Sequence, residues 1–188
     1  MAKVVVAITT GLTTSKMVSV AITGSPAVGK TTVSQLLSSQ GWEVLTVSEL
    51  AKQFECQGEF DESMDSLEID VHKLSEEYCP DGDNDIIIDG HLSHFLDVDA
   101  IVILRCQPDK LRDRLSTRGY NEAKINANVE WELISGTWAE ILEFEINQPI
   151  LELDVTNDSP SDSISKINNW INNGFESSQQ RKIDWLNQ

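Results

Sequence analysis

Short apolar segments rich in Val, Ile and Leu alternate along this chain with longer segments whose apolar residues recur at helical spacing. Short apolar runs of this kind are typical of strands whose two faces are both buried. Strands of this type that are separated by helices form a parallel sheet with helices packed on both sides. The pattern therefore predicts an α/β fold with five parallel strands, at residues 18–23, 43–47, 85–89, 100–104 and 150–155.

Helices are expected between and after these strands. The predicted helices cover residues 32–37, 48–51, 71–78, 108–118, 121–146 and 161–170. In the longest of them, Trp131 and Trp138 lie at helical spacing with Ile134 and Leu142, and we expect the two tryptophans to belong to the core. Residues 55–70 carry seven carboxylates and no basic residue, and they are predicted to be irregular.

The chain is long enough for one buried core, and no change in composition divides it into two domains. We expect a single domain at residues 17–172. The Asn-, Gln- and Ser-rich tail at 173–188 is expected to be frayed.

The first residues resemble the start of the predicted domain. Residues 5–11 repeat the pattern of residues 18–24, but no helix is predicted directly after them. We interpret residues 1–16 as an extension outside the core, with an additional edge strand as the alternative. A signal peptide is not predicted, because the apolar run is short and no cleavage site of the A-x-A type follows it.

The second copy leads into a phosphate-binding motif. Residues 24–31 read GSPAVGKT and fit G-x-x-x-x-G-K-[ST], between a predicted strand and a predicted helix. Gly24 and Gly29 permit a backbone that turns successive N–H groups toward a phosphate, and the helix N-terminus adds partial positive charge. Lys30 is placed to reach the β- and γ-phosphates, and Thr31 to bind Mg²⁺. A plain glycine turn with an exposed lysine accounts less well for this order of elements.

An acidic residue ends the third predicted strand. Asp89 follows Ile86-Ile87-Ile88, which is the form of the strand-end aspartate that holds Mg²⁺ in phosphate-loop enzymes. Two residues further on, His91 is a candidate to orient an attacking water or to sense the γ-phosphate. The alternatives are that Asp89 only forms a turn and that His91 is satisfied by a backbone carbonyl.

A cluster of arginines lies in the predicted helix at residues 108–118, which follows the fourth predicted strand. Arg112, Arg114 and Arg118 are three of only five arginines in the chain. Guanidinium groups neutralise the charge of a transferred phosphoryl group. We predict that Arg118, which lies beside a glycine at a potential hinge, is the arginine that contacts the transferred phosphoryl group. For Arg112 and Arg114 the alternative is that they pair with acids on their own helix.

The excess of acidic residues limits the kinds of molecule that this protein is expected to bind. Fourteen basic residues against 31 acidic ones give a net charge of −17 and a pI near 4.3. A broad nucleic-acid-binding face is excluded, because phosphate neutralisation needs clustered Lys and Arg, whereas a basic protein partner suits this surface. The three widely spaced cysteines form neither a disulfide framework nor a zinc motif, which favours a reducing, cytoplasmic environment.

Three segments together carry a family resemblance. The stretches TGSPAVGKTT, DGH and RLSTRGYNEAKINANVEWEL resemble the adenylate kinase isoenzyme 6 family, and the resemblance spans almost all of residues 17–170. It implies a phosphate-loop fold of the adenylate kinase type, with a segment that binds the nucleoside monophosphate (NMP) near 46–69 and a short lid near 117–127. It also implies phosphoryl transfer between ATP and AMP or other NMPs, ATP hydrolysis and Mg²⁺. Members act in small ribosomal subunit maturation, so a basic small-subunit ribosomal protein and the pre-ribosomal small subunit are implied partners.

The resemblance also assigns residues. It implies that the ATP phosphates are held by the loop and by the lid arginine, that is by Gly24, Ala27, Gly29, Lys30, Thr31, Thr32 and Arg118. Asp89 and His91 correspond to the family's Mg²⁺ and hydrolysis element.

Three departures from the family pattern stand out, one of which is that the stretch after Asp89-Gly90-His91 lacks the further arginine usual in longer adenylate kinases. Ala27 replaces a glycine, which is tolerable if its φ is negative. Lys52 replaces the arginine that meets the monophosphate in the family's L-A-R-E element, so it keeps the charge but loses the bidentate fork.

Other functions stay open at this stage. A regulatory GTPase is disfavoured because the chain has no suitably placed pair of N-K-x-D and D-x-x-G motifs. A kinase for another small acceptor would share the loop and the fold. A nucleotide-binding assembly chaperone with little kinase activity would share the same motifs.

Overall fold

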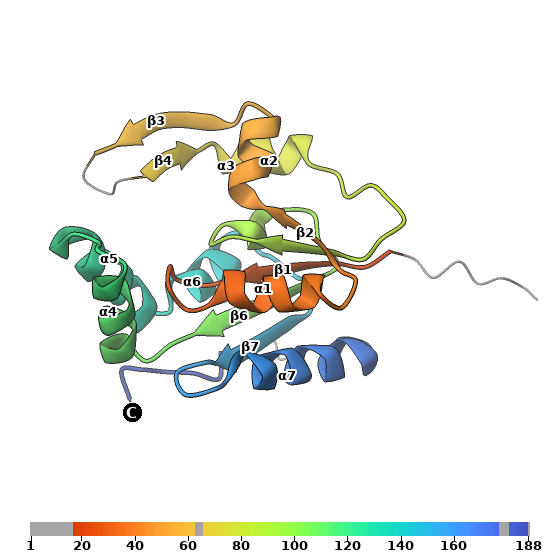
Figure 1. The fold of residues 1–188 in the computed structure, drawn as a ribbon. Coiled ribbons are helices and arrows are strands. Elements are labelled where there is room, and N and C mark those ends of the chain that lie inside the picture. Colours follow the sequence, from red (N-terminus) through yellow and green to blue (C-terminus); the bar gives the residue numbers. More distant parts are fainter. Residues whose placement is uncertain (1–16, 63–65, 177–180, 188) are drawn as a thin grey trace, which may run out of the picture.

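The computed structural model describes residues 17–62, 66–176 and 181–187 (Figure 1). The predicted extension at 1–16 therefore lies outside the described residues. The core is a five-stranded sheet in the order β2-β5-β1-β6-β7, and every neighbouring pair is parallel. All five predicted strands are confirmed: β1 Ser19–Thr23, β2 Glu43–Thr46, β5 Ile86–Asp89, β6 Ala100–Arg105 and β7 Ile150–Asp154.

Helices cover both faces of this sheet. They are α1 Lys30–Ser38, α2 Val47–Gln53, α3 Val71–Glu77, α4 Pro108–Thr117, α5 Glu122–Leu133, α6 Gly136–Glu143 and α7 Pro160–Asn172, with a short 3₁₀ turn at Ser93–Phe95. Side chains alternate along a strand, so Val20 and Ile22 of β1 pack with α1, α4, α5 and α7, whereas Ala21 packs with α2, α3 and α6. Figure 1 shows α1 and α7 on one side of the sheet and α2 with α3 on the other. The predicted α/β fold is confirmed.

The acidic segment is not irregular, and that prediction was wrong. Strands β3 (Gln57–Asp61) and β4 (Ser66–Ile69) pair antiparallel as a hairpin separate from the main sheet. Phe60 lies opposite Leu67, and these side chains are 54% and 47% exposed. Nearly all residues of the two strands are exposed, and only Ile69 at the end of β4 packs against a core, so the sequence lacks the alternation that indicates a half-buried strand.

The predicted helix at 121–146 is in fact two helices, α5 and α6. The chain turns at Ser135, whose φ of 60° is left-handed and ends a helix. A Cβ on Gly136 would lie 2.1 Å from the Trp131 ring, so this close packing requires glycine. Trp138 is buried as predicted, but Trp131 is 37% exposed, so the core assignment of Trp131 was wrong.

Part of the C-terminal tail packs on the domain, although the sequence predicts fraying. In the segment 181–187, Trp185 is buried, and its indole Nε1 donates a hydrogen bond to Oε1 of Glu132 at 2.9 Å. Backbone N–H groups of Lys182 and Ile183 donate to Oε2 of Glu152. In the described part of the chain, no helix is long and apolar enough to cross a membrane.

Candidate active site

The strand register brings three loops to one edge of the sheet. Asp89 at the end of β5 lies level with Ile22 of β1 on one side and with Thr46 of β2 on the other. The phosphate loop, the Asp89-Gly90-His91 turn and the start of α2 all follow these positions. Ligands of parallel α/β sheets bind at this carboxyl edge, which makes it the candidate site.

The local structure of the phosphate loop depends on its small residues. Gly24 has a φ of 126°, and a Cβ there would lie 2.2 Å from the carbonyl oxygen of Leu104. Gly29 has a φ of 113° and precedes α1. Ala27 has a φ of 66°, so the negative φ under which we considered this alanine tolerable is not observed. Its left-handed conformation costs about 1–2 kcal/mol relative to an unstrained backbone.

Lys30 folds back onto the loop. Its Nζ donates to the carbonyl oxygens of Gly24 at 2.8 Å and Ser25 at 2.9 Å. Removal from water by the surrounding protein lowers the pKa of Lys30 to about 8, the nearby Asp89 carboxylate opposes this fall, and Arg118 adds to it. The lysine therefore remains mostly charged at pH 7, and a phosphate is a stronger acceptor for it than two neutral carbonyls.

A cavity of about 470 Å³ lies between the phosphate loop, the hairpin and α5. This volume is in the range of small-molecule sites. Seven of the predicted site residues line it, namely Ala27, Gly29, Lys30, Thr31, Asp89, His91 and Arg118. Gly24 instead lines a neighbouring cavity of about 320 Å³ behind the loop. Thr32 and Lys52 are exposed and do not line either cavity.

Asp89 and Thr31 provide oxygen ligands of the kind that Mg²⁺ prefers. The Asp89 side chain is 6% exposed at the end of β5, and Thr31 lies in the first turn of α1. No cluster of three His, Cys, Asp or Glu residues suited to a metal occurs among the described residues. Two protein oxygens fit an ion that keeps several waters and binds substrate phosphates, which is the usual mode for Mg²⁺.

His91 lies at the wall of the same cavity. Burial of its ring, and then the positive charge of Lys30, lowers the pKa of His91 to about 4, although the residue as a whole is exposed to solvent. The ring is therefore neutral at pH 7. His94, in contrast, is buried, with Nδ1 at 3.0 Å from Oγ1 of Thr23, and it lines neither cavity.

The three arginines of the cluster have different surroundings in the structure. Of the three arginines, only Arg118 lines the cavity. Arg112 pairs with Glu122 at 3.1 Å rather than with an acid on its own helix. Arg114 donates to the carbonyl oxygens of Val28, Val155 and Thr156 and so ties α4 to the loops.

Helix α5 and the residues just before it contribute cavity-lining residues that were not predicted from the sequence. Tyr120, Lys124 and Asn128 line the cavity, and Lys124 is 8% exposed, with its Nζ 4.2 Å from the centroid of the Tyr120 ring. The spacing of four residues places Lys124 and Asn128 on one helix face, which was a usable signal. Thr46, Ser48 and Ser66 complete the polar wall on the hairpin side.

A phosphate loop, a strand-end aspartate and basic side chains at the carboxyl edge of a parallel sheet define a phosphate-loop protein of the nucleotide kinase type. Residues 20–135 match the family model described as "AAA domain". A protein of Thermococcus kodakarensis is 38% identical over 169 residues, covering 88% of this chain and 92% of the relative. One of Methanocaldococcus jannaschii is 34% identical with the same coverage, and both carry the name "Putative adenylate kinase". The chain belongs to this adenylate-kinase-like family.

Solved structures support the same fold. Deoxyadenosine kinase from M. mycoides with bound dATP matches with a TM-score of 0.51 at 17% identity, covering 82% of this chain and 99% of the other. The YorR protein of Bacillus subtilis matches with a TM-score of 0.51 at 18% identity, covering 82% and 95%. At this level of identity the likeness concerns the fold alone.

Proposed function

We propose that this protein is a nucleoside monophosphate kinase of the adenylate kinase isoenzyme 6 type, which transfers the terminal phosphoryl group of ATP to AMP or another NMP. The observation that carries the proposal is the convergence of Lys30, Asp89 and Arg118 on one cavity at the carboxyl edge of the sheet. These are the groups that phosphoryl transfer needs, because its catalysis is mostly positioning and charge neutralisation. The names of the archaeal relatives support the same activity.

The loop holds the donor phosphates in this proposal. Lys30 exchanges its two carbonyl partners for β- and γ-phosphate oxygens, and Arg118 neutralises charge on the transferred group. The bond between the γ-phosphorus and the β–γ bridging oxygen of ATP breaks, ADP leaves with that oxygen, and a phosphate oxygen of the monophosphate bonds to the γ-phosphorus. Thr31 and Asp89 would hold Mg²⁺, which would supply neutralisation of the phosphate charge when bound.

The acceptor enters from the side of residues 46–69. Thr46, Ser48 and Ser66 offer hydroxyl groups there. Lys52 stays our proposed contact to the monophosphate, which requires the NMP segment to close over the cavity, because the lysine is exposed on α2. Closure of such segments over substrate is common among kinases.

ATP hydrolysis is a second proposed activity. A water replaces the monophosphate as acceptor, and the neutral ring of His91 orients it.

We further propose that the protein acts in the cytoplasm on the pre-ribosomal small subunit through a basic ribosomal protein. The exposed acidic hairpin supports a basic partner.

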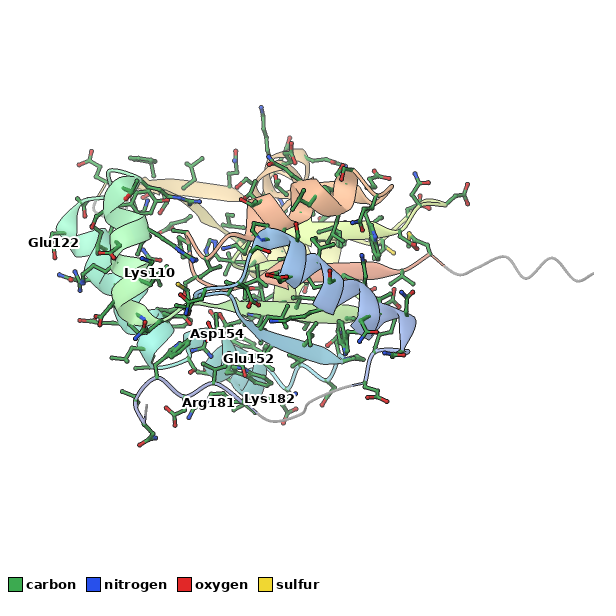
Figure 2. All side chains as sticks on the ribbon, turned by 60° about the horizontal axis from the view of Figure 1, so that its bottom comes forward. Lys110, Glu122, Glu152, Asp154, Arg181 and Lys182 are labelled. Atoms are coloured by element: carbon green, nitrogen blue, oxygen red, sulfur yellow. The ribbon has the colours of Figure 1, made fainter. Side chains whose placement is uncertain are left out.

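A coupled assay with ATP and each monophosphate tests the kinase. We expect ADP formation that depends on the monophosphate, and Lys30→Ala should lower kcat by about a hundredfold or more while the fold is retained. Lys110→Ala on α4 (Figure 2) is the matched control, because this exposed lysine does not line the cavity. ATP binding without turnover would instead indicate a chaperone, and turnover only with another acceptor would indicate a different kinase.

A further inference from the structure

A buried cluster of charges lies behind the phosphate loop. Nε of Arg105 on β6 contacts Oε1 of Glu132 on α5 at 2.6 Å, and Nη1 contacts Oε1 of Glu152 on β7 at 2.7 Å. All three residues are at most 7% exposed. One guanidinium therefore faces two carboxylates, and the excess of buried negative charge needs further hydrogen-bond donors to stabilise it.

The C-terminal segment 181–187 supplies three of these donors. The Trp185 indole donates to Glu132 at 2.9 Å, and the N–H groups of Lys182 and Ile183 donate to Glu152 at 2.7 and 3.1 Å. The Arg105 guanidinium carbon also lies 5.8 Å from the centroid of the Trp185 ring. Figure 2 shows Arg181 and Lys182 of this segment beside Glu152. The segment thus completes a buried network instead of covering a neutral surface.

The same network reaches the phosphate loop. Oγ of Ser25 donates to Oε2 of Glu132 at 2.6 Å, and both residues are 2% exposed. The carbonyl oxygen of Ser25 accepts a hydrogen bond from Nζ of Lys30 at 2.9 Å. Glu132 therefore contacts Trp185 with one carboxylate oxygen and the loop with the other.

We propose that Glu132 is a positioning residue for the phosphate loop, and that the docked C-terminal segment holds it in place and thereby raises the affinity for ATP. The effect on ATP rests on the proposed function. Glu132 touches no reacting group and acts through Ser25.

The physical reason is the cost of removing one of the three donors that hold Oε1 of this buried carboxylate, which also accepts from Nε of Arg105 at 2.6 Å and from the N–H of Cys106 at 3.3 Å. Without the Trp185 donor, Glu132 replaces the lost hydrogen bond only by moving toward its remaining donors or by admitting water. Either change alters its short bond to Ser25 and the loop backbone that receives the phosphates. Misplacement of a site by small shifts of its supporting groups is a common cause of lost affinity.

The test compares two tryptophans in the full chain. Trp185→Phe removes the donor to Glu132 and should weaken ATP binding by about fivefold to tenfold. Trp170→Phe is the matched control, because the Trp170 indole is 6% exposed and donates to the carbonyl oxygen of Glu176 at 2.7 Å, away from the loop. Dissociation constants for ATP and melting temperatures are measured for both. Equal weakening by both variants would overturn the proposal, because the loss would then follow general stability.

A double-mutant cycle tests whether Trp185 affects the phosphate loop through Glu132 and Ser25. In a Ser25→Ala background the Trp185→Phe effect should largely disappear, because the link to the loop is already absent. Full additivity of the two effects would overturn the proposal that Trp185 acts on the loop through Glu132 and Ser25.

Hydrogen exchange of the amides at residues 24–31 gives a readout without nucleotide, and we expect faster exchange in Trp185→Phe than in Trp170→Phe. Wild-type protein that binds no ATP would refute the proposed function, while the exchange comparison would still decide the coupling.

Discussion

Ala27 occupies a left-handed backbone conformation in the middle of the phosphate loop, with a φ of 66°. Glycine adopts this conformation without the Cβ clash, but it also gives the unfolded chain more freedom. The relief of strain is the larger of the two effects. At the scale of one residue, the loop therefore adopts a backbone conformation that alanine disfavours.

We predict that Ala27→Gly raises the free energy of unfolding by up to about 1 kcal/mol, measured by urea denaturation. Ala139→Gly is the control of opposite sign. This alanine is exposed within α6, where glycine should cost about 1 kcal/mol. Destabilisation by both variants would show that the left-handed φ stores no strain.

At the scale of elements, the break between α5 and α6 shows a tertiary contact overriding a helical pattern. Gly136 lets the chain pass against the Trp131 ring, and Ser135 accepts a hydrogen bond from Nη2 of Arg105 at 3.0 Å. The break turns α6 onto the sheet, where Trp138 and Ile141 are buried. A continuous helix would carry these residues away from the core.

Gly136→Ala should therefore destabilise the protein by about 1–3 kcal/mol, although alanine is the better helix former. The measurement is the same denaturation experiment. The reason is the contact of 2.1 Å between the new Cβ and the Trp131 ring. In a Trp131→Ala background the penalty should vanish, and a penalty that persists there would place its cause in the backbone.

At the scale of the whole molecule, the net charge is −17, and residues 55–70, which include the β3–β4 hairpin, carry seven carboxylates and no basic residue. The hairpin presents carboxylates beside the cavity that we assign to nucleotide phosphates. Such charge opposes the approach of anions, so it fits a basic partner better than a phosphate site.

Changing Glu59, Glu62 and Glu68 to Gln should slow association with the basic ribosomal protein by roughly tenfold at low salt, with ATP hydrolysis nearly unchanged. Stopped-flow binding at several salt concentrations measures this. The control neutralises three exposed acids outside the hairpin, namely Asp113 on α4, Glu130 on α5 and Glu143 on α6. Equal slowing in both triple variants would leave net charge as the only cause.

The sequence by itself determined the five strands, the phosphate loop and the candidate residues Lys30, Asp89 and Arg118. These features have local causes. A buried parallel strand is a continuous apolar run, and the loop motif is eight consecutive residues whose backbone requirements can be read directly.

Only the tertiary structure decided the hairpin, the turn at Ser135 and the network around Glu132. Ser25 and Glu132 are 107 residues apart in the chain, and Trp185 is 53 residues beyond Glu132. No periodicity links such positions, because their hydrogen bonds exist only once the sheet has brought α5 and the tail behind the loop. The physical reason is that burial selects partners for polar groups by proximity in space, and the chain order does not record that proximity.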